Sequence, residues 1–173
     1  MTEKNPYTAL ARASIKSWLL KRKALEIPAD TPDELLNKRA GAFVTLYKSD
    51  CLRGCIGTIS PVRKSLAEEI ICNAVAAATE DPRFPRVRPE ELEDLVISVD
   101  VLGEAEPVET MAELDPVRYG VIVSKGFRRG LLLPNLDGID SVQEQVSIAL
   151  AKAGIHPHEP YKMERFEVTR HEE

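Results

Sequence analysis

The chain has 173 residues, a length that suits one domain or two closely packed subdomains. Its composition is ordinary for a globular protein, with 43% hydrophobic and 29% charged residues. The formal net charge of −5 makes nucleic-acid binding an unexpected role, because general nucleic-acid binders are usually basic.

The cysteine content and the N-terminal residues indicate the cellular compartment. Three cysteines, an odd number in a chain of this length, do not make a disulfide framework. The polar start, Thr2 to Asn5, lacks the apolar core of a signal peptide. No apolar run approaches the length that a bilayer requires. We therefore expect a cytoplasmic protein with reduced thiols and no membrane segment.

The N-terminal part of the chain predicts two helices. The first covers about residues 6–25, with Asn5 as its cap and Pro6 in its first turn. Trp18 falls on the apolar stripe of this helix, so we expect it in the core. Thr31 and Glu34 have the spacing of a capping box for a short second helix.

Residues 43–59 predict a β-hairpin whose second strand carries the sequence Leu-Arg-Gly-Cys-Ile-Gly. Regular alternation would place Leu52, Ile56 and Thr58 on one face of that strand. Arg53 and Cys55 would then share the opposite face, about 6.6 Å apart. This pairing of a cation with a thiol is typical of a functional site.

Two glycines, Gly54 and Gly57, lie inside the same strand. Glycine weakens a strand, and it often marks a place where backbone or ligand approaches closely. We therefore expect that a side chain added at either position would enter occupied space.

A helix follows the hairpin, beginning after Ser65 and ending near Thr79, with Glu68 completing a capping box. Its alanine-rich stripe predicts close packing on the sheet. The next segment, Asp81-Pro82-Arg83-Phe84-Pro85, has two interpretations. It is either a connector whose Phe84 enters the core, or a loop that forms a second wall of the site.

The C-terminal half of the chain predicts more hairpins than parallel crossovers. We expect strands over residues 95–102, 119–124, 130–133 and 162–170, and a helix from Ser141 to Ala153 with Glu144 in its capping box. Asp100 lies in the middle of the first of these strands, on a mixed face. The predicted fold class is α+β, mainly antiparallel, with helices packed on the sheets.

The motif at residues 52–57, the alanine-rich helix and Asp81-Pro82-Arg83-Phe84 together resemble the AMME-chromosomal-region protein family. Prokaryotic members of this family are often called AmmeMemoRadiSam system protein A. The similarity covers nearly the whole chain, including Glu90-Glu91-Leu92 and residues 120–134. It implies a single domain over residues 1–173, built as two subdomains around a cleft beside the motif strand. It also implies association with Memo-type and radical-SAM proteins, but no settled reaction.

The candidate ligand-binding residues come from two segments: Arg53, Gly54, Cys55 and Gly57 from the motif, and Asp81, Arg83 and Phe84 from the following loop. We expect them to bind a small polar or anionic group. We expect no metal and no cofactor. Cys51 and Cys55 would lie about 13 Å apart on a straight strand, too far to share a metal ion. His156 and His158 flank a proline and have no identified partner.

Two functional hypotheses remain open. In the first, the protein is an accessory or binding component of a radical-SAM- and Memo-linked modification pathway, with Cys55 a small buried hydrophobe. In the second, it is an enzyme in which Cys55 is the nucleophile, Arg53 favours its thiolate, and Asp81 orients Arg53 or accepts a proton. An RNA-associated regulatory role is a weaker alternative because of the acidic charge.

Overall fold

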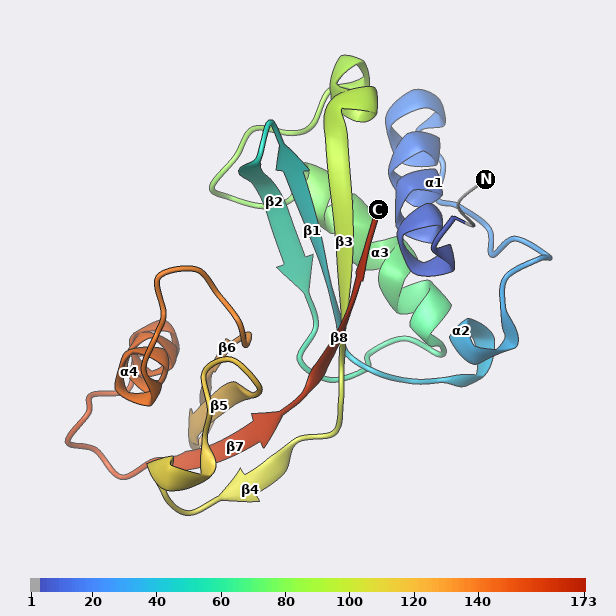
Figure 1. Ribbon diagram of the computed structural model, residues 1–173. Helices are drawn as coiled ribbons and strands as arrows, with labels where there is room; N and C mark the ends of the chain where they lie inside the picture. Colours follow the sequence, from blue (N-terminus) through green and yellow to red (C-terminus); the bar gives the residue numbers. More distant parts are fainter. Residues whose placement is uncertain (1–3) are drawn as a thin grey trace. The chain divides into compact units, whose positions relative to one another are not determined.

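A computed structural model describes residues 4–173 of the chain (Figure 1). The chain divides into two compact units. The first contains the residues up to Val101 together with Thr169–Glu173, and the second is Leu102–Val168. Each unit has its own hydrophobic core. No helix in residues 4–173 is long and apolar enough to cross a membrane.

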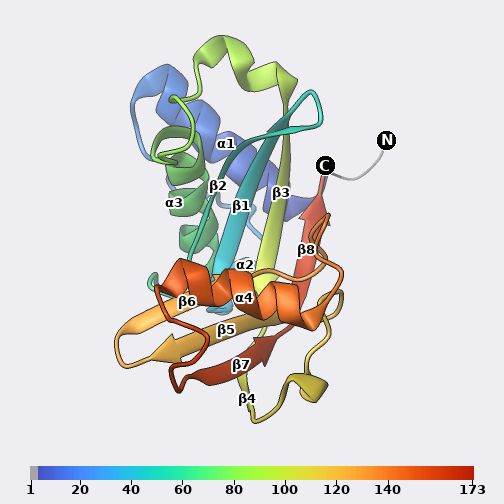
Figure 2. The same ribbon diagram turned by 90° about the vertical axis from the view of Figure 1, so that its left-hand side faces the viewer.

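The first unit is built on a four-stranded sheet with helices on one face. Figure 2 shows α1 and α3 together on one side of this sheet. The strand order is β2-β1-β3-β8, and β1 runs antiparallel to both of its neighbours. The elements are α1 (Pro6–Lys21), α2 (Asp33–Asn37), β1 (Ala42–Lys48), β2 (Cys51–Gly57), α3 (Leu66–Thr79), a 3₁₀ helix (Pro89–Asp94), β3 (Leu95–Leu102) and β8 (Val168–Glu172).

The second unit has its own antiparallel sheet, with strand order β4-β7-β5-β6. Its α4 packs against β5 and β6 and runs beside β5 in Figure 2. Its elements are β4 (Glu106–Val108), a short 3₁₀ helix (Met111–Glu113), β5 (Gly120–Lys125), β6 (Arg128–Leu132), α4 (Val142–Ala153) and β7 (Lys162–Phe166). Helices combined with two antiparallel sheets confirm the predicted α+β class.

Most helix termini follow their local sequence signals. Asn5 accepts a hydrogen bond from the Tyr7 amide, and Ser65 accepts one from the Glu68 amide. Ser141 and Glu144 form the expected reciprocal capping box. The first helix is shorter than predicted, because Arg22 adopts a left-handed conformation with φ 53° and ends it.

Two local predictions are wrong for reasons that lie in tertiary contacts. The Thr31 and Glu34 capping box does not form, because α2 begins after Pro32 and Glu34 accepts a hydrogen bond from the Tyr7 hydroxyl instead. The single strand predicted over residues 162–170 is two strands. β7 belongs to one sheet and β8 to the other.

A β-bulge at Arg53 changes the faces predicted for the motif strand. Leu46 pairs with Gly54 and Tyr47 with Leu52, so Arg53 has no residue directly opposite on β1. Directly opposed residues point to the same side of a sheet, so Leu52 shares the face of Tyr47. The prediction that Leu52 and Ile56 share a face is therefore wrong.

The sheet face that carries Cys55 is the one opposite α3. Val44 and Leu46, whose side chains alternate with Thr45, are fully buried in the core beneath α3. Thr45 pairs with Cys55, so the thiol points away from that helix. The motif strand thus presents Gly54 to the helix and Cys55 to the other face.

The two motif glycines are required by close packing. A Cβ atom on Gly54 would lie 2.2 Å from the Ala77 carbonyl oxygen of α3. A Cβ atom on Gly57 would lie 2.3 Å from the Phe43 ring on the neighbouring strand. The expected close approach at these glycines is therefore made by the helix backbone and by an aromatic ring.

Replacing Gly54 by valine should destabilise the protein, although valine has the higher β-propensity. The Ala77 carbonyl belongs to helix backbone and cannot rotate away, so we expect a loss of about 2–3 kcal/mol. In a chain of this size, that loss corresponds to a drop in Tm of roughly 4–12 °C. Thermal unfolding followed by circular dichroism measures it.

Leu52→Val on the same strand is the matched control, because Leu52 is exposed. It should change Tm by no more than about 2 °C. A Gly54→Val protein as stable as the Leu52→Val protein would show that α3 does not limit the space at Gly54.

Candidate functional site

The Asp81 carboxylate closes the free edge of the motif strand. β2 is the outermost strand of its sheet, and its Cys55 amide donates a 3.0 Å hydrogen bond to Asp81 Oδ2. Arg83 donates to the same carboxylate through its amide, its Nε and its Nη2, at 3.0, 3.0 and 2.8 Å. Asp81 is buried, and the hydrogen bonds from Arg83 hold its pKa well below the usual range.

The Arg53 guanidinium is held by a different carboxylate, that of Glu91. Its Nε and Nη2 donate to the two Glu91 oxygens at 3.1 and 3.0 Å, and its Nη1 donates to the Pro85 carbonyl at 2.8 Å. Lys48 also donates to Glu91. Pairing with Arg53 lowers the pKa of Glu91 to about 2. The prediction that Asp81 orients Arg53 is therefore wrong.

The Cys55 thiol is largely buried and contacts a hydroxyl group. Its Sγ lies 3.2 Å from Thr45 Oγ1, at hydrogen-bond distance. Burial raises the pKa of Cys55, and the hydrogen bond with Thr45 and the charge of Arg83 oppose this rise only in part. Arg83 is the cation that lowers the pKa of this thiol. The Arg53 guanidinium is bound to Glu91 instead. At neutral pH the thiol is therefore protonated.

A second carboxylate–guanidinium pair lies on the same sheet face. Asp100 is opposite Phe43, two residues along β1 from Thr45, and is only 1% exposed. Its carboxylate accepts hydrogen bonds from Arg170 Nε and Nη2 at 2.7 and 3.3 Å. Asp81 and Asp100 both act to raise the pKa of Cys55. The charges that act on the thiol are therefore those of Arg83, Asp100 and Asp81.

The structure brings the candidate residues to one strand and its edge, with different roles. Cys55, Asp81 and Arg83 are directly connected, whereas Gly54 and Gly57 serve packing. Phe84 is half-buried, and its ring centre lies 5.5 Å from the Arg83 guanidinium carbon.

Sequence reasoning missed three residues of this arrangement: Thr45, Glu91 and Arg170. Only Thr45 could have been found from the sequence. It lies in the strand predicted to pair with the motif strand, where its hydroxyl can contact a thiol. Glu91 and Arg170 lie 38 and 70 residues from the groups that they bind. Nothing local in the sequence pairs them.

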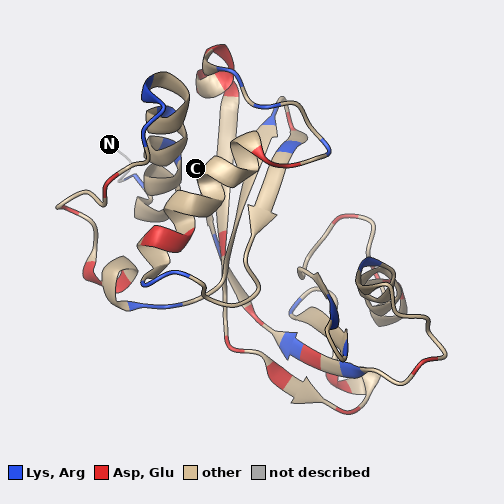
Figure 3. Cartoon of the chain, turned by 180° about the vertical axis from the view of Figure 1, so that it is seen from behind, with Lys and Arg blue, Asp and Glu red and all other residues tan. Residues whose placement is uncertain are grey.

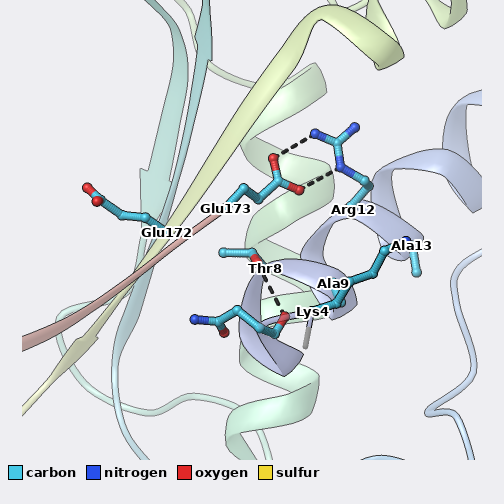
Figure 4. Close-up of a pocket in the computed structure, with 8 residues that line it drawn as sticks. Lys4, Thr8, Ala9, Arg12, Ala13, Glu172 and Glu173 are labelled. Carbon is cyan, nitrogen blue, oxygen red and sulfur yellow. Dashed lines mark hydrogen bonds and ion pairs between the residues drawn. The ribbon is translucent and has the colours of Figure 1, made fainter. Parts of the chain in front are cut away.

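A separate pocket of about 500 Å³ lies between α1 and the end of β8 (Figure 4). Ala9 and Ala13 line it, and Arg12 and Glu173 form a bidentate ion pair at its rim with both distances 2.7 Å. Arg12 also donates to the backbone carbonyl of Leu92 at 2.8 Å. Arg12 and Glu173 are therefore paired with each other, and none of the motif residues lines this pocket.

Within residues 4–173, no group of three or more His, Cys, Asp or Glu side chains is placed to hold a metal ion. His156 and His158 lie beside each other in a loop, with ring centres 5.0 Å apart.

The ion pair of Arg53 and Glu91 should make stability depend on acid pH. The folded-state pKa of Glu91 is about 2, below its usual 4.5, so its contribution is present above about pH 4.5 and lost as the pH falls toward 2. We expect Glu91→Gln to lower the unfolding free energy at pH 7 and to flatten its decline between pH 5 and pH 3. Urea denaturation at each pH measures this.

Glu90→Gln, an exposed position on the same 3₁₀ helix, is the control and should keep the wild-type pH dependence. If Glu91→Gln and wild type decline in parallel over this pH range, the Arg53–Glu91 pair does not contribute to folding.

Comparison with known proteins identifies the family of this chain. The family model described as AMMECR1 matches residues 8–172. A protein of Thermotoga maritima is 51% identical over 173 residues, covering 99% of each chain. A protein of Clostridium acetobutylicum is 52% identical over 172 residues, which are 99% of this chain but 36% of that longer protein.

The comparison with solved structures agrees. The crystal structure of an uncharacterized protein from Pyrococcus horikoshii matches with a TM-score of 0.89 at 37% identity, covering 96% of this chain and 89% of the other. Both the sequence match and the fold therefore extend over nearly the whole chain, which belongs to the AMMECR1 family.

Proposed function

We propose that the protein is a binding component whose motif strand presents a fixed polar surface to a small polar or anionic group. The proposal depends on one observation: the Cys55 thiol and the carboxylates of Asp81 and Asp100 are already hydrogen-bonded, and burial keeps Cys55 protonated. A nucleophile needs a thiolate and a free base, whereas here burial raises the pKa of Cys55 and Asp81 already accepts hydrogen bonds from the Cys55 amide and Arg83.

Arg83 is the residue through which the ligand binds. Its side chain is 56% exposed, yet two hydrogen bonds to Asp81 fix its orientation. Within residues 4–173, its Nη1 has no hydrogen-bond partner, so a donor remains for a ligand oxygen. A guanidinium fixed in this way loses little conformational entropy on binding an anion. Phe84 beside it provides an apolar contact.

We further propose that this binding serves a modification pathway that includes Memo-type and radical-SAM proteins. The family resemblance of the motif supports this assignment. The Clostridium acetobutylicum relative also supports it, because there the equivalent of this chain is part of a longer protein. An accessory module is expected to occur both alone and joined to other regions of a protein.

Inorganic phosphate is a direct probe of the proposed anion site. At 10 mM phosphate, a Kd of about 1 mM would stabilise the folded state by about 1.4 kcal/mol. This corresponds to a rise in Tm of roughly 3–6 °C relative to chloride at equal ionic strength. Because Arg83 supplies the free donor, Arg83→Gln should abolish the rise, whatever its own starting Tm.

Arg86→Gln is the matched control, because Arg86 is an exposed arginine in the same loop. It should keep the full response to phosphate. An equal response in the Arg83→Gln and Arg86→Gln proteins would remove Arg83 from the site.

The enzyme hypothesis makes a different prediction for Cys55. If the thiol is a protonated, buried group, iodoacetamide should label Cys55 more slowly than the exposed Cys51 at pH 7.5. Arg83→Met and Arg53→Met should leave the rate for Cys55 low. Peptide-resolved mass spectrometry of the folded protein measures the rates. Labelling of Cys55 that outpaces Cys51 and falls in either arginine variant would favour a catalytic thiol.

A further inference from the structure

A polar pocket of about 510 Å³ lies in the second unit, and none of the motif residues lines it. It is bordered by the start of the unit, by β7 and by the residues before β5. Its lining residues are Gly103, Glu104, Glu106, Arg118, Tyr119, Arg165, Phe166 and Glu167. Figure 3 shows basic and acidic bands next to one another on β7 and β4, the strands that supply part of this lining.

Two guanidinium groups of this pocket contact one aromatic ring. The guanidinium carbons of Arg118 and Arg165 lie 4.9 and 4.4 Å from the centre of the Tyr119 ring. Arg165 Nη1 also donates to the Glu113 carbonyl at 2.7 Å. The buried Gln145 donates to the Tyr119 carbonyl at 2.8 Å and fixes the backbone beneath the ring. The Tyr119 ring therefore positions both guanidiniums, and the Glu113 carbonyl also positions that of Arg165.

Both arginines retain free donors. Arg118 binds Glu167 through Nε at 3.0 Å, and Arg165 binds Glu106 through Nε at 3.2 Å. Within residues 4–173, the two Nη atoms of Arg118 and the Nη2 atom of Arg165 have no hydrogen-bond partner. The side chains of Glu106 and Glu167 are 64% and 60% exposed, and such exposed ion pairs are weak. A ligand carboxylate can therefore bind the two guanidiniums without displacing a buried group.

The charge of the lining selects the kind of ligand. Two arginines and three glutamates give the pocket a formal charge of −1, which disfavours a simple anion. Glu104 is exposed and has no hydrogen bond or ion pair within residues 4–173. A ligand that carries a carboxylate and an ammonium group satisfies both the open guanidinium donors and this free carboxylate.

We propose that this pocket binds a zwitterionic α-amino acid, with its carboxylate on Arg118 and Arg165 and its ammonium group toward Glu104. The volume falls in the range of small-molecule sites and leaves room for a side chain beside Tyr119 and Phe166. This site is independent of the motif strand, so it does not rest on the function proposed for Cys55 and Arg83.

Titration with L-alanine, followed by ¹H–¹⁵N correlation spectra of the full chain, tests the proposal. N-acetyl-L-alanine lacks the ammonium charge, and L-alaninamide lacks the carboxylate. We expect L-alanine to shift the amide signals of Gly103, Tyr119 and Glu167 with millimolar affinity, and each analogue to bind at least tenfold more weakly. Equal binding of N-acetyl-L-alanine would overturn the proposal in favour of a simple anion site. No shift by L-alanine up to 50 mM would overturn it altogether.

Three variants assign the contacts. Arg118→Gln and Glu104→Gln should each weaken L-alanine binding at least tenfold, and both positions are exposed, so the spectra should otherwise keep their folded dispersion. Arg129→Gln is the control, because Arg129 is a surface arginine of the same unit that lies outside the pocket. Wild-type affinity in the Arg118→Gln protein, or an equal loss in the Arg129→Gln protein, would overturn the assignment.

Discussion

The buried carboxylate of Asp81 is the group on which the arrangement around the motif strand depends. An outermost strand has unpaired amides along one side, and these attract other strands if they are left open. Asp81 binds the amide of Cys55 and three donors of Arg83 at once, so it closes this edge and fixes the next loop in one contact. The Arg53–Glu91 pair fixes the same loop further along, through the Pro85 carbonyl. Together, the hydrogen bonds of Asp81 and the Arg53–Glu91 ion pair hold this edge in one arrangement.

The other side of the motif strand is determined by packing. α3 approaches so closely that the Ala77 carbonyl occupies the space where a side chain of Gly54 would be. This explains why a strand accepts a residue of low β-propensity at this position. The Phe43 ring, on the neighbouring strand, likewise occupies the space where a side chain of Gly57 would be. Because Gly54 and Leu46 face the helix, Cys55 and Thr45, which follow and precede them, point to the other face.

The electrostatics of that face keep the Cys55 thiol protonated. Burial is the largest influence and raises the pKa of the thiol; the Thr45 hydrogen bond and Arg83 lower it, and Asp100 and Asp81 raise it further. What remains is a neutral thiol, a hydroxyl group and a fixed guanidinium with one open donor. Such groups can recognise a ligand without changing their own protonation state. The similarity extends over nearly all of a Thermotoga maritima protein and over about a third of a longer Clostridium acetobutylicum protein.

The sequence by itself determined the features that depend on neighbours along the chain. Periodicity and capping gave the α+β class, the motif hairpin, and the helices that begin after Ser65 and Ser141, because their hydrogen bonds join residues three positions apart. It also singled out Cys55 and Asp81 as candidate site residues, through the unusual strand glycines and the resemblance of the motif. It did not identify the partners. Arg53 binds Glu91, Asp81 binds the Cys55 amide, and Asp100 binds Arg170, across 38, 26 and 70 residues. The bulge at Arg53 also reversed the face of Leu52. Only the tertiary structure decided these contacts, because a carboxylate binds whichever hydrogen-bond donor the folded chain brings within reach, regardless of its separation in sequence.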